Sequence, residues 1–222
     1  MKKIMKVFLC IAVIASLYGC KNYKIRKING ETVYTIEKSS YVESKEETDL
    51  VKIEVDGYGI IIAELYPDIA PITVKNFKKL VSEKFYDGLV FHRVIKDFMI
   101  QTGDPTGTGT SGSEDTIKGE FALNGVTNDL SHTRGVLSMA RLGAESDELE
   151  TPATMDSASS QFFIVHKDSL WLDGKYAAFG KVIHGMDVVD SVAFSVTDDN
   201  DKPLNEKTIK SIRFVKAYEG DK

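Results

Sequence analysis

One stretch near the middle of the chain places an arginine and an amide next to bulky apolar side chains. It covers residues 91–104 and reads FHRVIKDFMIQTGD. Because side chains alternate between the two faces of a strand, Met99 and Gln101 share one face beside Phe98. Arg93 is always charged and donates hydrogen bonds only. The chemistry available to this set is hydrogen-bond donation at an apolar surface, although Arg93 taken alone is equally consistent with an ordinary solvated charge.

Other patterns that could carry chemistry lack the context they need. The run GTGTSG at 107–112 matches the dinucleotide-binding pattern G-x-G-x-x-G, but it follows a turn and leads into polar residues instead of opening a helix. No G-x-S-x-G elbow is present, and the sequence shows no catalytic-triad signature. It does not exclude a triad whose residues are distant in the chain and meet only in the fold. The four histidines are widely spaced and no cysteine is near them. We therefore expect no metal site and no cofactor.

Length and charge limit the class of protein. With 222 residues and 42% hydrophobic content, the chain can form one well-buried core but not two full-sized domains. The net charge of −5 leaves no basic excess, so nucleic acid is not an expected partner. Both cysteines, Cys10 and Cys20, precede the folded part, which excludes a disulfide within it. We expect a monomer with one folded domain and appendages.

The first twenty residues have the pattern of an export signal. Residues 1–6 carry three lysines, and the almost unbroken apolar run at 7–17 is too short to span about 30 Å of hydrocarbon comfortably as a helix. The run ends in LYGC, which resembles the bacterial lipobox, where cleavage exposes the cysteine for lipidation. We expect residues 1–19 to be a lipoprotein signal peptide. Cys20 would then carry acyl chains such as palmitate and anchor the protein at the extracytoplasmic face of a bacterial cell membrane. An uncleaved membrane anchor is the alternative.

Residues 20–48 are predicted to be a flexible tether that starts at the lipidated cysteine. They are rich in Lys, Glu and Ser and have little apolar periodicity. One short strand is compatible with the β-prone run at 32–36. The rest of the chain, residues 49–219, is predicted to be the folded domain.

The folded domain has the pattern of a β-protein with two helices. A Gly-containing turn at 56–59 between two β-rich runs indicates a hairpin. Pro71 followed by apolar residues at helical spacing predicts a helix over about 70–83, and a second is expected near 186–193. The β-prone runs lie at 50–55, 60–65, 90–95, 98–102, 135–140, 161–166, 178–183 and 209–217. Eight strands with only two helices favour a closed antiparallel barrel.

Three more motifs follow the first one in order along the chain. They are GVLSMA at 135–140, SSQFFI at 159–164 and WLDGK at 171–175. Together with residues 91–104 they closely resemble the cyclophilins, over about residues 50–217. The resemblance implies a closed eight-stranded antiparallel β-barrel capped by two α-helices, which agrees with the strand count. It also implies a peptidyl-prolyl cis/trans isomerase, here in a lipoprotein form, that acts on proline-containing polypeptides without a cofactor.

The same resemblance assigns roles to matching residues. Arg93 corresponds to the catalytic arginine, and Gln101 is expected to act with it. The proline pocket corresponds to Phe98, Met99, Phe163 and Leu172. The positions that hold the substrate backbone correspond to Gln101, Ala140 and Arg141. His92 also matches, but a lone histidine beside a core strand is more often structural.

Two residues at the rim of the implied pocket bear on ligands. Trp171 matches the position whose indole N–H binds the cyclic peptide inhibitor cyclosporin, so cyclosporin binding is predicted. Tyr176 stands where many eukaryotic cyclophilins have histidine, and we interpret it as a pocket-wall residue. The loop at 142–155 is longer than usual for the family and acidic; it is either a solvated surface loop or a substrate-selecting one.

The implied reaction suits these residues. Rotation about a peptide bond has a barrier of about 18–20 kcal/mol because the nitrogen lone pair is delocalised into the carbonyl. A donor that hydrogen-bonds the proline nitrogen only when it becomes pyramidal stabilises the twisted amide over the planar one, and Arg93 suits this role. We expect a folding catalyst for exported or surface proteins. A surface-anchored peptide-binding or adhesive module with little turnover is the alternative.

Overall fold

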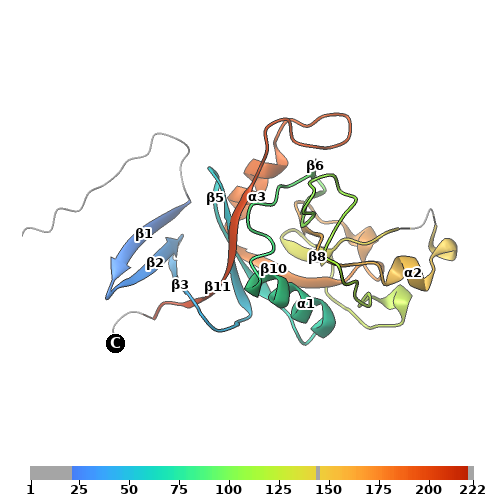
Figure 1. Cartoon of the computed structure of the whole chain (residues 1–222), viewed down its shortest axis with the longest axis horizontal. Helices are drawn as coiled ribbons and strands as arrows, with labels where there is room; N and C mark the ends of the chain where they lie inside the picture. Colours follow the sequence, from blue (N-terminus) through green and yellow to red (C-terminus); the bar gives the residue numbers. More distant parts are fainter. Residues whose placement is uncertain (1–21, 144–145, 220–222) are drawn as a thin grey trace, which may run out of the picture.

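A computed structural model describes residues 22–143 and 146–219 of the chain (Figure 1). The expected signal peptide and Cys20 lie outside these residues. The strands are β1 (Tyr23–Ile28), β2 (Glu31–Ile36), β3 (Ser39–Glu43), β4 (Leu50–Val55), β5 (Gly59–Leu65), β6 (Arg93–Ile95), β7 (Met99–Thr102), β8 (Val136–Met139), β9 (Phe162–Val165), β10 (Ala178–His184) and β11 (Ile209–Ala217). The α-helices are α1 (Pro71–Ser82), α2 (Pro152–Met155) and α3 (Met186–Ala193). Three 3₁₀ turns, η1 (Ala122–Asn124), η2 (Asp147–Leu149) and η3 (Leu170–Leu172), complete the described elements.

The strands form one antiparallel sheet, which corrects the expected closed eight-stranded barrel. Eleven strands are paired in the order β1-β2-β3-β11-β4-β5-β10-β8-β9-β7-β6. The eight strands β4 to β11 match the expected ones, but no ladder joins β6 to β11 in the part of the chain that the structure describes. An isolated bridge between Val90 and Thr208, with a bond of 2.9 Å from Phe91 N to Lys207 O, spans that gap instead. The barrel is not closed because β6 is only three residues long, and the loop segments at 90–91 and 207–208 face each other there instead of two strands.

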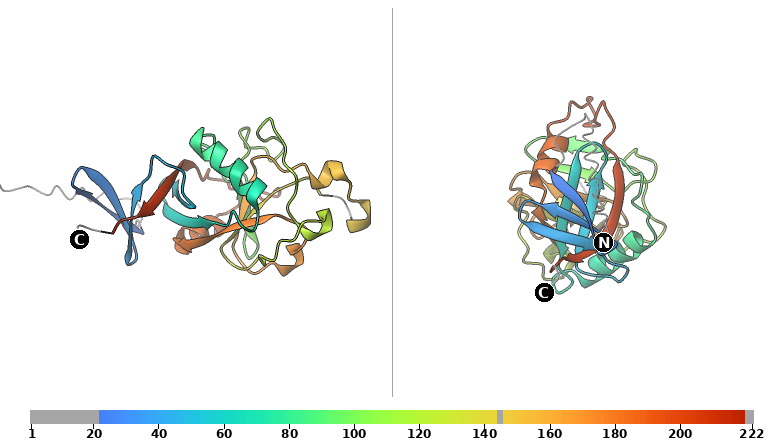
Figure 2. Two further views of the ribbon diagram at one scale, coloured as in Figure 1. Left: turned by 90° about the horizontal axis from the view of Figure 1, so that it is seen from below. Right: turned by 90° about the vertical axis from the view of Figure 1, so that its left-hand side faces the viewer.

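The N-terminal strands differ from the expected tether. β1, β2 and β3 form a meander, and β3 continues the sheet by pairing with the end of β11 (Figure 2). Asn29 and Gly30 both have positive φ, which is the two-residue turn that favours a hairpin. Ile36 and Tyr41 are buried in a small apolar cluster together with Ile60, Ile62 and Val215. The meander is ordered because alternate side chains have an apolar surface to cover, a pattern that the high Lys and Glu content obscures.

The main core holds α1 against the sheet. α1 begins at Pro71 and buries Val74, Phe77, Leu80 and Val81, as the apolar spacing predicts. The Phe77 ring packs against three other buried rings, those of Tyr86, Phe162 and Phe179, with centroids 5.2–5.3 Å away. Full burial of one such side chain stabilises the fold by about 1.5–3 kcal/mol. Since Phe162 lies on β9, this packing fixes a strand whose next residue reaches the candidate site.

A buried carboxylate supplies the cap that α1 lacks locally. Ala70, at the N-terminus of α1, has no capping side chain. Glu120 instead accepts hydrogen bonds from the backbone N–H groups of Ile72 (3.0 Å) and Thr73 (2.7 Å). A negative charge is favourable at this end of a helix because the free N–H groups carry partial positive charge. The segment around residue 120 is thereby tied to the helix.

Candidate active site

Three neighbouring strands bring Arg93, Gln101 and Phe163 into one row. Arg93 on β6 is the register partner of Gln101 on β7, and Gln101 is the partner of Phe163 on β9. Directly paired residues of antiparallel strands point to the same face of the sheet, so the three side chains are neighbours. Met99, two residues before Gln101, lies on that face as the strand alternation predicts.

This row borders a cavity of about 160 Å³. The cavity is lined by Arg93, Phe98, Met99, Gln101, Ala140, Arg141, Phe163, Leu172 and Tyr176. Met99, Phe163 and Leu172 are buried and form the floor as one apolar cluster. Trp171 does not line the cavity; the residue is 60% exposed, and the centre of its indole ring lies 5.4 Å from that of the Phe98 ring at the rim. The structure therefore brings together nine of the ten predicted binding or catalytic residues, with the tenth next to them.

Arg93 is held only weakly at the edge of this cavity. Its Nε lies 3.4 Å from Oδ2 of Asp201, and both side chains are nearly half exposed. The backbone N–H of Val94 donates to Asp201 O (2.8 Å), which fixes the loop that carries this carboxylate. An exposed ion pair contributes about 0–1 kcal/mol, so Asp201 orients the guanidinium without neutralising it strongly. Sequence reasoning missed Asp201 because it lies 108 residues away from Arg93.

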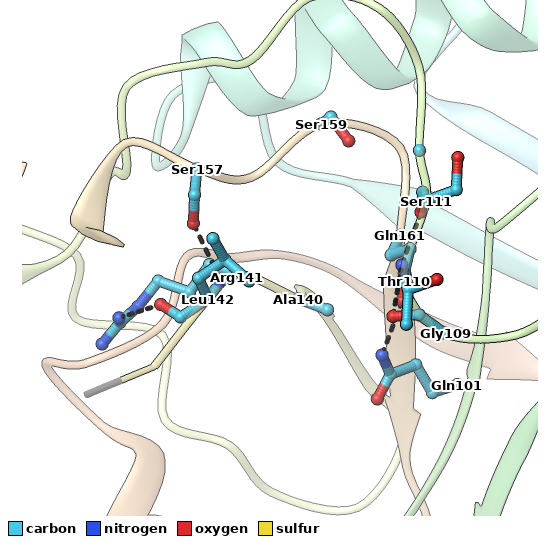
Figure 3. A pocket seen from close by; sticks show the side chains of 11 residues that line it. Gln101, Gly109, Thr110, Ser111, Ala140, Arg141, Leu142, Ser157, Ser159 and Gln161 are labelled. Carbon is cyan, nitrogen blue, oxygen red and sulfur yellow. Dashed lines mark hydrogen bonds between the residues drawn. The ribbon is translucent and has the colours of Figure 1, made fainter. Parts of the chain in front are cut away.

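A second hollow of about 250 Å³ adjoins the first. Figure 3 shows Gln101 and Gln161 along one of its walls, with Ser157 and Leu142 opposite. Gln101 Nε2 donates to Gln161 Oε1 (2.8 Å), and Gln161 Nε2 donates to Ser111 O (2.6 Å). The Gln101 amide is thus oriented by a partner on β9's N-terminal flank.

One carboxylate organises the Gly-rich run at 107–112, of which residues 109–112 form a wall of that hollow. Asp104 accepts hydrogen bonds from the backbone N–H groups of Thr106 (2.7 Å), Gly109 (2.6 Å) and Ser111 (3.2 Å). Burial acts to raise the pKa of Asp104, but these bonds and one from the Thr106 hydroxyl outweigh it and lower the pKa to about 2. The N–H groups that a phosphate would need are therefore already occupied.

The Arg141 guanidinium is bound within the protein. Its Nη1 lies 2.8 Å from Glu150 Oε1, and the two side chains are only 3% and 6% exposed. The guanidinium also lies 4.8 Å from the centre of the Tyr176 ring and 4.9 Å from that of Phe121. The predicted contact of Arg141 with a substrate backbone stays a prediction, and the structure adds Glu150, a residue that sequence reasoning did not single out.

Behind the cavity, Ser138, His132 and Asp173 lie in the arrangement of a catalytic triad, which the sequence alone did not exclude. His132 Nε2 is 2.9 Å from Ser138 Oγ, and His132 Nδ1 is 2.8 Å from Asp173 Oδ1. Ser138 and His132 are both buried, so this hydroxyl has no access to a substrate. Burial lowers the pKa of His132, although Asp173 opposes the effect. Because the His132 ring stacks on Phe163 at 6.2 Å, the array supports the cavity floor.

The comparisons with known proteins identify the class. Residues 50–214 match the family described as cyclophilin type peptidyl-prolyl cis-trans isomerase. The chain belongs to this family, and it is a peptidyl-prolyl cis-trans isomerase. Among curated relatives, ppi1 of Schizosaccharomyces pombe is 43% identical over 69% of this chain and 92% of its own length. Peptidyl-prolyl cis-trans isomerase-like 1 of Homo sapiens is 40% identical over 72% of this chain and 86% of its own.

A solved structure agrees with the assignment. A Cryptosporidium parvum cyclophilin type peptidyl-prolyl cis-trans isomerase, crystallised in the presence of the dipeptide Ala-Pro, is 33% identical, with a TM-score of 0.64 over 74% of this chain and 97% of that one. Both curated relatives named above are eukaryotic, so they lend no support to a bacterial lipoprotein form. In the described parts of the chain, no helix is long and apolar enough to cross a bilayer.

Proposed function

We propose that this isomerase acts on exported or surface proteins from a lipid anchor at Cys20, and that Arg93 stabilises the twisted X-Pro amide. The single observation that carries the mechanism is the position of Arg93 at the edge of the apolar cavity over Met99 and Phe163. A proline ring bound in this cavity would place its nitrogen within reach of the guanidinium. The Cryptosporidium relative crystallised with Ala-Pro supports a proline-containing ligand of this kind.

The proposed mechanism needs no covalent step. In the planar amide the proline nitrogen has no lone pair to offer, whereas in the twisted state it becomes a hydrogen-bond acceptor. Arg93 donates to that nitrogen in the twisted state alone, so the interaction lowers the barrier instead of only strengthening binding. Accelerating the reaction about 10⁵-fold requires about 7 kcal/mol of transition-state stabilisation. Removal of water by Phe98, Met99 and Phe163 strengthens the hydrogen bond that supplies part of it.

Gln101 and its neighbours are proposed to hold the flanking backbone. The Gln101 amide is oriented by its hydrogen bond to Gln161, and Gln101 lines both hollows. Fixing the chain on one side of the X-Pro bond keeps that side still while the other side turns. The second hollow, walled by residues 109–112, accommodates the chain that precedes the proline.

The location of the enzyme rests on the N-terminal pattern. The basic residues, the apolar run and the LYGC junction support export and acylation at Cys20. The meander β1 to β3 would then lie between the membrane and the catalytic domain and act as an ordered spacer. Enzyme at the outer face of a membrane meets newly exported chains before their prolines have reached the native isomer.

A protease-coupled assay on an X-Pro peptide tests the proposed function. The full chain in detergent micelles should accelerate isomerisation well above the buffer rate, and spheroplasts of expressing cells should show the same activity on added peptide. A native circular dichroism spectrum with a rate equal to that of buffer would overturn the catalytic proposal. Activity that appears only after the cells are lysed would overturn the proposed location.

A further inference from the structure

One wall of the proline cavity is attached to the acidic loop by a buried ion pair. Arg141 follows β8 and lines both hollows, while Glu150 belongs to the loop between η2 and α2. The Arg141 guanidinium donates to Glu150 Oε1 and Leu142 O (both 2.8 Å) and to Lys175 O (3.0 Å). Its central carbon lies over the ring of Tyr176, which lines the cavity and meets the Phe163 ring edge-on at 6.1 Å. Glu150, Arg141, Tyr176 and Phe163 thus form a continuous series of contacts.

Glu150 is itself fixed on its other side. Its Oε2 accepts a hydrogen bond from the Thr154 hydroxyl (2.6 Å), and Thr154 belongs to the capping box of α2 with Thr151. The backbone of the loop is also held at Leu142, whose N–H donates to Ser157 Oγ (2.8 Å). The Glu150 carboxylate is therefore presented to Arg141 by local structure and needs no rearrangement to meet it.

We infer that Glu150 is a positioning residue for the isomerase site, because it holds the Arg141 guanidinium against Tyr176 and so keeps that ring in place as a wall of the proline cavity. The inference rests on the proposed use of this cavity for proline. It gives the long loop a part in substrate binding that its acidity alone does not reveal.

Physical chemistry supports a directional effect. A buried arginine that loses its carboxylate partner is left as an uncompensated charge, so the guanidinium should move towards water. Both hollows that Arg141 lines open to solvent, and its movement would leave Tyr176 without the cation that packs on its ring. A displaced Tyr176 alters ground-state and transition-state contacts with the proline ring to the same extent. The effect should therefore fall on KM more than on kcat.

The loop also offers a matched control. Asp147, three residues before Glu150, forms an ion pair of 2.7 Å with Lys175, but there both side chains are about half exposed. Such an exposed pair contributes little to stability. Asp147→Asn removes one negative charge from the same loop, as Glu150→Gln does, but it removes no partner of Arg141, because Asp147 pairs with the ammonium of Lys175 and Arg141 donates to the Lys175 backbone O.

The test is a double-mutant cycle on the full chain in detergent micelles, with KM and kcat measured on an X-Pro peptide. Glu150→Gln should raise KM by about three- to tenfold with kcat changed by less than about twofold, while Asp147→Asn and the conservative Glu150→Asp stay close to wild type. In a Tyr176→Ala background the Glu150→Gln effect should shrink to less than about twofold, because the ring through which it acts is gone.

Each other outcome has a definite meaning. A Glu150→Gln enzyme with wild-type KM, or an effect of equal size with and without Tyr176, would overturn the inference. If Glu150→Gln does not fold, Arg141→Lys takes its place in the cycle with Tyr176→Ala, and an Arg141→Lys effect of equal size with and without Tyr176 would overturn the inference equally. A wild-type chain without turnover would instead contradict the proposed function, so the two failures are distinguishable.

Discussion

Arg93 and Gln101 face each other directly across the paired strands β6 and β7. The pairing places a permanent hydrogen-bond donor next to an amide that can hold a peptide, with the apolar side chains of Met99 and Phe163 beside them. A chain that crosses this row would have its proline ring on the apolar floor and its backbone along Gln101.

The Gly-rich wall should make the protein acid-sensitive through Asp104. Its folded-state pKa of about 2 lies below the ordinary value, so its contribution to stability is fully present above about pH 4 and is lost as the pH falls towards 2. The contribution is about 2–3 kcal/mol. Asp104→Asn should lower the free energy of unfolding at pH 7 and flatten its pH dependence between pH 4 and 2, as measured by urea unfolding at each pH. An unchanged slope in that window would contradict the assignment of Asp104.

The N-terminal meander should contribute to stability. Ile36 is 1% exposed and packs with Tyr41 and Val215, whereas Ile25 on the edge strand is 53% exposed. Ile36→Ala should cost about 2–5 kcal/mol in the free energy of unfolding, and Ile25→Ala less than about 0.5 kcal/mol. Chemical denaturation of the form lacking residues 1–20 measures both. If both substitutions had equally negligible effects on the free energy of unfolding, residues 20–48 would be a flexible tether, as the sequence predicts.

Cys20 should be the site of lipidation. Expression in a bacterium with radiolabelled palmitate should yield a labelled, membrane-bound form, and Cys20→Ser should abolish both label and membrane attachment. The Cys10→Ser variant is the matched control, since that residue would leave with the signal peptide. Label retained in Cys20→Ser would show that the LYGC motif is not a lipobox here.

Trp171 should report cyclosporin binding. Its indole N–H is a donor at an exposed rim position beside Phe98, so Trp171→Phe leaves the ligand carbonyl unpaired at a contact that the ligand buries. The loss should be about 1–3 kcal/mol, or roughly five- to 150-fold in affinity. Titration followed by tryptophan emission measures the wild-type affinity, and inhibition of turnover measures both forms. Normal catalysis with no response of rate or emission to saturating cyclosporin would rule out this role.

Local patterns predicted most of the catalytic domain. The apolar spacing after Pro71 predicts α1 because a helix that covers one core must repeat its apolar residues at that spacing. Strand alternation likewise places Met99 and Gln101 on one face. The roles of Arg93, Phe163 and Leu172 came from the resemblance to cyclophilins, and the structure brings these residues to one cavity.

The features that sequence reasoning missed depend on partners far along the chain. The contact of Arg93 with Asp201 and the array of His132 with Asp173 each join segments more than 40 residues apart, and no local signal announces them. The meander did have a signal, the Asn29-Gly30 turn between two β-prone runs, but the charged composition favoured a tether. The open edge of the sheet beside β6 could not be predicted because the length of a strand depends on the loop that faces it.

The most direct test of the account is a comparison of kcat and KM for Arg93→Ala and for Asp201→Asn, with the wild type as reference. If Arg93 bonds the proline nitrogen only in the twisted amide, Arg93→Ala should lower kcat by about 10²–10³-fold with KM changed by less than about threefold. Asp201→Asn, which removes only the weak orienting contact, should keep kcat within about threefold of wild type. An Arg93→Ala enzyme that folds normally and keeps the wild-type kcat, with its loss confined to KM, would show that Arg93 binds substrate without stabilising the twisted state and would contradict the mechanism.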